Sequence, residues 1–169
     1  MTKVQVVSGD ITRVKADALI TPVGNHDFWF GVVNMAIRSV AGFLFHLQIT
    51  KALFDDDFLE GETVIALSNG CPHQGKFTNV VFVIDNLRLP LHKIVYNGLK
   101  TADVAGFKSV SLPISLPTIR MDTINQVQEI VNEMAKGIKE FLERGGLDSI
   151  TIVVDNDPET LEMLEAALK

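Results

Sequence analysis

The chain has 169 residues, of which 47% are hydrophobic and 21% charged, and its formal net charge is −6. This length is typical of one domain, and the composition supplies a buried core, so we expect residues 1–169 to form a single domain. The acidic balance disfavours non-specific binding of nucleic acid, because the protein would repel a phosphate backbone. A small phosphorylated ligand is still compatible, since backbone amides hold phosphate without net positive charge.

The chain has one cysteine, Cys71, which excludes an intramolecular disulfide and a cysteine-based metal cluster. We expect a reducing, cytoplasmic setting. The first five residues lack the apolar core of a signal peptide. The most apolar window, residues 28–49, is interrupted by polar side chains, which favours a buried amphipathic helix over a membrane span. The histidines lack metal-ligand spacing, and we expect no metal and no other cofactor.

Strands and helices alternate along the chain. Periodicity predicts strands over residues 4–7, 18–23, 63–67, 79–85, 109–113 and 147–154. It predicts helices over residues 30–45 and 91–105, a long helix capped by Asp122 or Thr123 and ended by Gly145, and a closing helix over 158–168. The later strands are almost continuously apolar, which is typical of strands buried on both faces, so helices should cover both sides of the sheet.

Ligands of such sheets bind at the carboxyl ends of the strands. The segments that follow expected strands are therefore the candidate site. They comprise residues 9–12, 22–27, 68–75, 114–121 and 155–156.

Two motifs near the N-terminus carry a family resemblance. The run Gly9-Asp10-Ile11-Thr12 follows the first expected strand, and residues 16–20 enter the second. Both resemble the opening of macro domains, the family that binds ADP-ribose, and the order of elements is similar over nearly the whole chain. The resemblance implies a three-layer α/β/α fold with a mixed central sheet. It also implies that Asp10 holds the adenine amino group and that Ile11 offers its backbone N–H.

The remaining site is also implied by the resemblance. Asn25 would contact the distal ribose, and Asn156 follows the strand after which the family often packs a side chain against adenine. Two loops would hold the diphosphate. Their residues are Gly31, Val32 and Val33 in the first loop, and Ser115, Pro117, Thr118, Ile119 and Arg120 in the second.

Both phosphate loops depart from the family pattern. Phe30, Val32 and Leu116 stand where relatives have small or glycine-rich segments, and Pro117 has no N–H to donate. Arg120 could supply bidentate donors instead, or could be an ordinary solvated arginine. Hydrolytic relatives carry an aspartate at the position of Asn34, and an amide cannot act as a general base.

Three hypotheses follow. The first is a binding module for ADP-ribose or a related adenine nucleotide, free or attached to a protein. The second is a hydrolase that removes ADP-ribose from a protein, an ester or a phosphate. The third is a degenerate domain with a closed pocket that serves in protein assembly.

Two features also have plain interpretations. Without the resemblance, Asp10 is best explained as the cap of a turn or short helix. Cys71 and His73 could form an activated nucleophile, but an ordinary loop explains them more simply.

Overall fold

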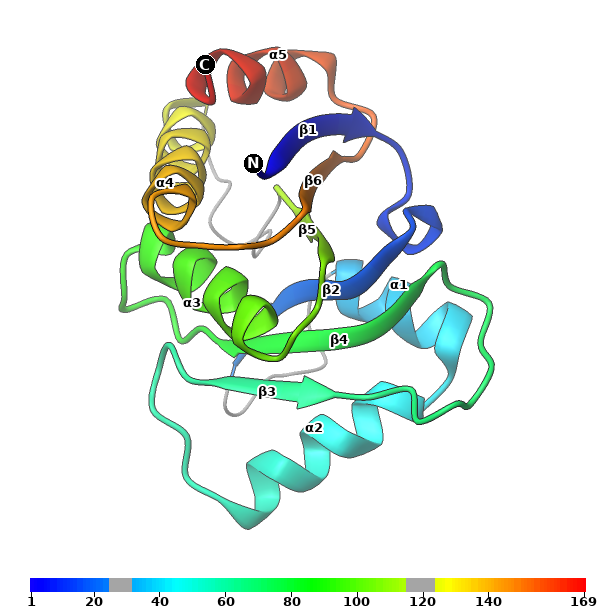
Figure 1. The fold of residues 1–169 in the computed structure, drawn as a ribbon. Coiled ribbons are helices and arrows are strands. Elements are labelled where there is room, and N and C mark those ends of the chain that lie inside the picture. Colours follow the sequence, from blue (N-terminus) through cyan, green and yellow to red (C-terminus); the bar gives the residue numbers. More distant parts are fainter. Residues whose placement is uncertain (25–31, 115–123) are drawn as a thin grey trace.

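A six-stranded sheet forms the centre of the protein (Figure 1). The computed structural model describes residues 1–24, 32–114 and 124–169. The strands are β1 (Lys3–Ser8), β2 (Ala16–Val23), β3 (Thr63–Ala66), β4 (Phe77–Ile84), β5 (Ser109–Pro113) and β6 (Ser149–Val154). Their order in the sheet is β1-β6-β5-β2-β4-β3, and every neighbouring pair is parallel except β3 and β4. The expected mixed sheet is therefore confirmed.

Helices cover both faces of this sheet. One layer contains α3 (Leu91–Val104), α4 (Ile124–Leu142) and α5 (Pro158–Ala167), and the other contains the short 3-10 helix η1 (Ile11–Arg13), α1 (Val32–Ala41) and α2 (Leu44–Asp55). Neighbouring residues of β2 alternate between the two cores: Ile20 packs under α3 and α4, whereas Leu19 packs under α1 and α2. This alternation is what a strand buried on both faces requires, and the three-layer α/β/α fold is confirmed. No helix of the described residues is long and apolar enough to cross a bilayer.

Two glycines allow close packing in the first layer. A Cβ atom on Gly98 of α3 would lie 2.6 Å from Ile20 Cγ2, and one on Gly137 of α4 would lie 2.6 Å from the carbonyl oxygen of His92. The missing side chains let α3 approach the sheet and let α4 approach α3.

The prediction of a single helix over residues 30–45 is wrong. Helix α1 ends at Ala41, and α2 begins at Leu44 and continues to Asp55. Gly42 causes the break, because it adopts φ 59°, a left-handed conformation that ends helices, while its N–H bonds the carbonyl of Arg38 at 2.8 Å. Elsewhere the expected elements are present with ends shifted by one or two residues. The predicted cap at Asp122 or Thr123 lies outside the described residues.

The direction of β3 corrects one candidate segment. Because β3 runs antiparallel to β4, residues 68–75 leave β3 at the edge where the parallel strands begin. Their placement at the ligand-binding edge was wrong. The segment that follows β4, residues 85–89, lies at the carboxyl edge instead, and sequence reasoning had counted Asp85 as part of the strand.

Candidate functional site

The carboxyl ends of β1, β6 and β5 lie next to one another in the sheet. Ser8 is paired with Val154 in the sheet, and Gly9 N–H donates to the carbonyl of Val154 at 2.9 Å. Ile114 N–H donates to the carbonyl of Val153 at 3.4 Å. The segments that begin at Gly9, Ile114 and Asp155 therefore all leave the sheet around the end of β6.

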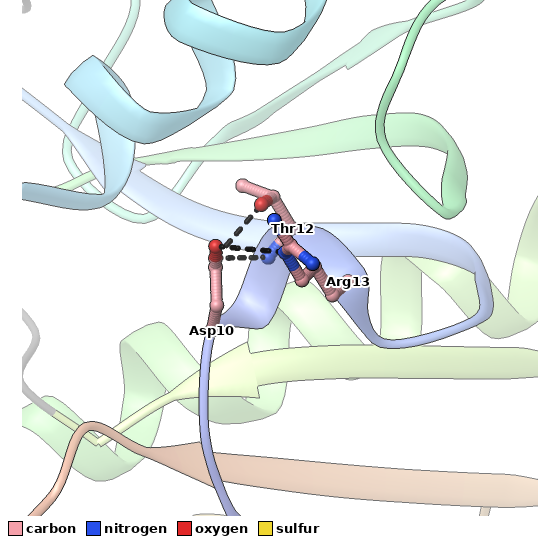
Figure 2. Close-up of polar contacts among 3 residues, drawn as sticks. All are labelled: Asp10, Thr12 and Arg13. Carbon is pink, nitrogen blue, oxygen red and sulfur yellow. Dashed lines mark hydrogen bonds and ion pairs between the residues drawn. The ribbon is translucent and has the colours of Figure 1, made fainter.

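Asp10 caps η1 through one carboxylate oxygen. Its Oδ1 accepts from the backbone N–H of Thr12 at 2.9 Å and from Thr12 Oγ1 at 2.7 Å (Figure 2). An oxygen that accepts two such bonds has little capacity left for a third donor. The plain interpretation of Asp10 as a cap is thus correct for this oxygen.

The second carboxylate oxygen of Asp10 is much less occupied. Its only described partner is Arg13 Nε at 3.7 Å, and the side chains of Asp10 and Arg13 are 52% and 85% exposed. An exposed ion pair of that length is weak. Oδ2 can therefore accept a hydrogen bond from a ligand without disturbing the cap.

Ile11, the next residue, has a backbone donor. Its side chain is 7% exposed and packs in the core under α1 and α2, which fixes the backbone at the start of η1. Within the described part of the chain, no acceptor is hydrogen-bonded to the Ile11 N–H. Open N–H groups are expected at the first residue of a helix.

Asn156 and Asp157 come directly after β6, whose last residue, Val154, accepts the hydrogen bond from Gly9 N–H. Asn156 is exposed and adopts φ 47°, which asparagine tolerates better than most residues. Asp157 caps α5 by accepting from Thr160 N–H at 3.1 Å and Thr160 Oγ1 at 2.6 Å. The hydrogen bonds from the side chain and backbone of Thr160 lower the pKa of Asp157. Three acidic residues, Asp10, Asp155 and Asp157, therefore follow the paired strands β1 and β6, and this acidic corner attracts amino groups rather than phosphate.

Asn34 and Asp85 meet the end of β2. The Asn34 side chain is 4% exposed and its Nδ2 donates to the carbonyl of Pro22 at 3.3 Å. Asp85 is 6% exposed, its N–H donates to the carbonyl of Val23 at 2.9 Å, and its Oδ1 accepts from Leu87 N–H at 3.0 Å. A buried amide and a buried carboxylate thus contact consecutive residues of one strand end. The carboxylate that ends the apolar run of residues 80–84 was the signal that sequence reasoning missed.

Most predicted phosphate and ribose contacts lie outside the described residues. This applies to Asn25, Gly31, Ser115, Pro117, Thr118, Ile119 and Arg120, and also to Phe30 and Leu116. Val32 is the first residue of α1, and the half-buried Val33 packs against the core under that helix. Of the predicted phosphate contacts, the structure therefore describes the backbone of Val32 and Val33 and the side chain of Val33, which faces the core.

Residues Cys71 and His73 lie at the opposite edge of the sheet. The His73 ring packs against Phe45 and Phe77, with ring centroids 5.3 and 5.0 Å apart, and its Nδ1 accepts from Gly75 N–H at 3.1 Å. Cys71 is exposed. This packing supports the ordinary-loop interpretation. The described residues contain no cluster of three side chains suited to a metal.

The architecture defines an α/β/α protein whose mixed sheet carries acidic side chains at the carboxyl ends of β1 and β6. No family model matches the sequence, and no curated protein matches it either. Solved structures do match. The macro domain of ganglioside induced differentiation associated protein 2 superposes with a TM-score of 0.76 at 14% identity, covering 98% of this chain and 84% of that one.

Two further solved structures carry nucleotides. An Oceanobacillus iheyensis macrodomain with ADP gives a TM-score of 0.71 at 18% identity, covering 96% of this chain and 88% of that one. A Trypanosoma brucei macrodomain in complex with ADP-ribose gives 0.73 at 18% identity, covering 98% and 69%. The protein described here therefore has the macrodomain fold.

Proposed function

We propose that this protein is a single macrodomain that binds ADP-ribose, or a related adenine nucleotide, at the carboxyl edge of its sheet. The observation that carries the proposal is Oδ2 of the half-exposed Asp10 side chain, whose only partner among the described residues is Arg13 Nε at 3.7 Å, followed in the chain by an Ile11 N–H without a described acceptor. The fold supports the ligand class, because similar structures were solved with ADP and with ADP-ribose.

This acceptor and donor match one edge of adenine. The exocyclic amine of adenine would donate to Asp10 Oδ2, and the adjacent ring nitrogen would accept from Ile11 N–H. Guanine and hypoxanthine carry a carbonyl at the place of that amine, so the same pair would select against them. The acidic corner formed by Asp10, Asp155 and Asp157 suits this contact and requires the diphosphate to lie elsewhere.

The diphosphate would lie toward the start of α1. The N-terminus of this ten-residue helix points backbone N–H groups outward at Val32 and Val33 and carries positive partial charge. We keep Gly31, Ser115, Thr118, Ile119 and Arg120 as further phosphate contacts, Pro117 as a wall of the same loop, and Asn25 as the ribose contact. Asn156 would lie beside the adenine.

A hydrolase is the second candidate, because a buried carboxylate is present near Asn34. Asp85 contacts the strand end that Asn34 also contacts, so it could serve the role that an amide cannot. Incubation with an ADP-ribosylated protein, followed by detection of released ADP-ribose, tests this. Release that is lost in Asp85→Asn while ADP-ribose binding is kept would establish an enzyme.

Titration calorimetry with ADP-ribose tests the binding proposal, with GDP-ribose as the matched control. Heat with ADP-ribose and little with GDP-ribose is the expected result. Ligand at 100 times its dissociation constant should also stabilise the fold by about 2.7 kcal/mol, which raises the melting temperature by roughly 5–10 °C. A folded protein that gives neither heat nor a thermal shift with millimolar ADP-ribose would leave only the closed-pocket hypothesis.

A further inference from the structure

The outward face of α2 carries three exposed apolar side chains, and the charged Lys51 lies between the second and the third. Phe43, Leu47 and Phe54, which we call the α2 stripe, are 51%, 65% and 90% exposed. Their spacings of four and seven residues place them on one side of the helix, over a length of about 16 Å. Figure 1 shows α2 at the lower margin of the molecule, beyond β3. Because these side chains are exposed, this side of the helix faces away from the sheet.

The fold itself does not need the stripe. The opposite side of α2 supplies the core contacts through Phe45, His46 and Ile49, which are all buried. The stripe leaves on the order of 400 Å² of apolar surface in water, comparable with the largest patch on an ordinary monomer. Such a patch commonly marks an interaction surface.

The edge strand next to α2 is partly blocked to the addition of a further strand. Next to α2, the side-chain amide of Gln48 bonds both backbone groups of Leu67, accepting from its N–H at 2.9 Å and donating to its carbonyl at 2.7 Å. These bonds occupy the chain where it leaves β3, the exposed edge strand. A strand from a partner would have to displace Gln48 before it could pair there along its full length.

The charges at the two ends of the stripe have opposite signs. At one end the guanidinium of Arg38 lies 4.6 Å from the centroid of the Phe43 ring. At the other end Asp55, Asp56 and Asp57 are three consecutive exposed carboxylates; Asp55 pairs with Lys51 of the same helix at 3.5 Å, so Asp56 and Asp57 carry the negative charge of this end. A surface with this polarity complements itself when a second copy is turned by a two-fold rotation.

We propose that α2 is the interface of a homodimer in which the α2 helices of two copies pack antiparallel. Phe43 of each copy packs against Phe54 of the other, and Leu47 lies near the two-fold axis. The acidic run of each copy then faces Arg38 of the other. A parallel arrangement would place the two acidic runs together, and two chains of net charge −6 already repel each other.

The size of the stripe sets the expected strength. A standard interface buries about 800 Å² on each partner, and the stripe supplies on the order of half of that area. The dimer is therefore weak, with a dissociation constant in the micromolar range. Sedimentation velocity between about 1 and about 200 µM should show the mass rising from one protomer to two.

Point variants test the surface directly. Leu47→Glu and Phe54→Glu should each raise the dissociation constant at least about tenfold, while Val104→Glu should leave it unchanged. Val104 is the matched control because it is 78% exposed at the end of α3, in the other helical layer. Thermal unfolding of each variant checks that the fold is intact.

A charge exchange tests the antiparallel arrangement. Arg38→Glu and Asp56→Arg should each weaken the dimer, and the double variant should restore it, because the two positions face each other only in an antiparallel pair. A single-protomer mass at every concentration would overturn the proposal. So would a mass that keeps growing beyond two protomers, an unaffected Phe54→Glu variant, or a double variant weaker than either single one.

Discussion

The variant Asp10→Asn separates the structural role of one side chain from the ligand-binding role proposed for it. The asparagine keeps an Oδ1 acceptor for Thr12 N–H and Thr12 Oγ1, which Asp10 now bonds at 2.9 and 2.7 Å. It replaces Oδ2, the proposed acceptor for adenine, by an NH₂ group that can only donate. Asparagine is as good a helix cap as aspartate, so the start of η1 should be preserved.

The expected magnitudes differ greatly between stability and binding. Folding loses only the 3.7 Å ion pair with Arg13, whose exposure limits its worth to under about 1 kcal/mol, or a shift of less than about 4 °C in melting temperature. Binding loses a hydrogen bond to a charged acceptor, worth about 1.5–3 kcal/mol. That loss corresponds to a dissociation constant for ADP-ribose raised by a factor of about 10 to 150.

A ligand change completes the experiment. Calorimetry of the wild type and of Asp10→Asn with ADP-ribose and with its hypoxanthine analogue gives a double-mutant cycle. The wild type should prefer ADP-ribose, and the variant should lose or reverse that preference, because its amide can donate to the hypoxanthine carbonyl. Arg13→Ala controls for the ion pair alone. Equal affinity of the wild type and Asp10→Asn for ADP-ribose would refute the assignment of Oδ2 to adenine.

Three further changes test the packing and the caps. Gly137→Ala should destabilise the fold by about 1–2 kcal/mol in urea unfolding, because its methyl group would lie 2.6 Å from the backbone oxygen of His92. This loss should exceed the roughly 1 kcal/mol by which alanine favours a helix over glycine. A gain in stability would mean that α3 and α4 have room to separate. Burial raises the pKa of the Glu133 carboxyl. Hydrogen bonds from the side chain and backbone of His92 to this carboxyl, with His92 Nδ1 at 2.6 Å from Oε2, and the His92 charge outweigh burial and bring that pKa below its ordinary value of 4.5. The stability that the Glu133 carboxylate contributes is thus present above pH 4.5 and lost as the pH falls below it. The difference in unfolding free energy between the wild type and Glu133→Gln should therefore shrink on acidification. A difference that stays constant with pH would contradict the interaction of Glu133 with His92. Asp157→Ala removes both bonds to Thr160 and should lower the melting temperature by about 2–4 °C in a thermal scan, with Asp157→Asn closer to the wild type; an unchanged melting temperature in Asp157→Ala would show that this cap contributes little.

Local sequence patterns predicted most of the fold because burial on two faces leaves a strong signal. Residues 80–84 of β4 are all apolar, four of the six residues of β6 are apolar, and the stripe of α4 has a clear helical period. The break between α1 and α2 was missed because a lone glycine inside an apolar helical pattern is often tolerated. Only the left-handed conformation of Gly42 shows that this glycine ends a helix.

The candidate site was less predictable because it depends on strand direction. Residues 68–75 and residues 85–89 both follow apolar strands, and nothing local distinguishes an antiparallel β3 from a parallel one. Pairing of Thr63 with Val83 decides that Asp85, and not His73, lies at the carboxyl edge. Periodicity alone placed Asp10 at this edge, whereas its two oxygens could be told apart only from their hydrogen bonds.

The two oxygens of Asp10 also explain why the motif of residues 9–12 indicates a fold more strongly than a function. Oδ1 and Thr12 form a cap that benefits the start of η1 whether or not a ligand binds. An unoccupied acceptor at Oδ2 is useful only to a protein that binds a ligand with a hydrogen-bond donor at that position. A macrodomain that had lost its ligand would therefore still be stabilised by an aspartate or asparagine at position 10, and the identity of this residue alone cannot separate the two cases. The ligand-binding edge and the α2 stripe are moreover formed by different residues, so a protein that dimerises through α2 without binding ADP-ribose would be the outcome that favours the closed-pocket hypothesis.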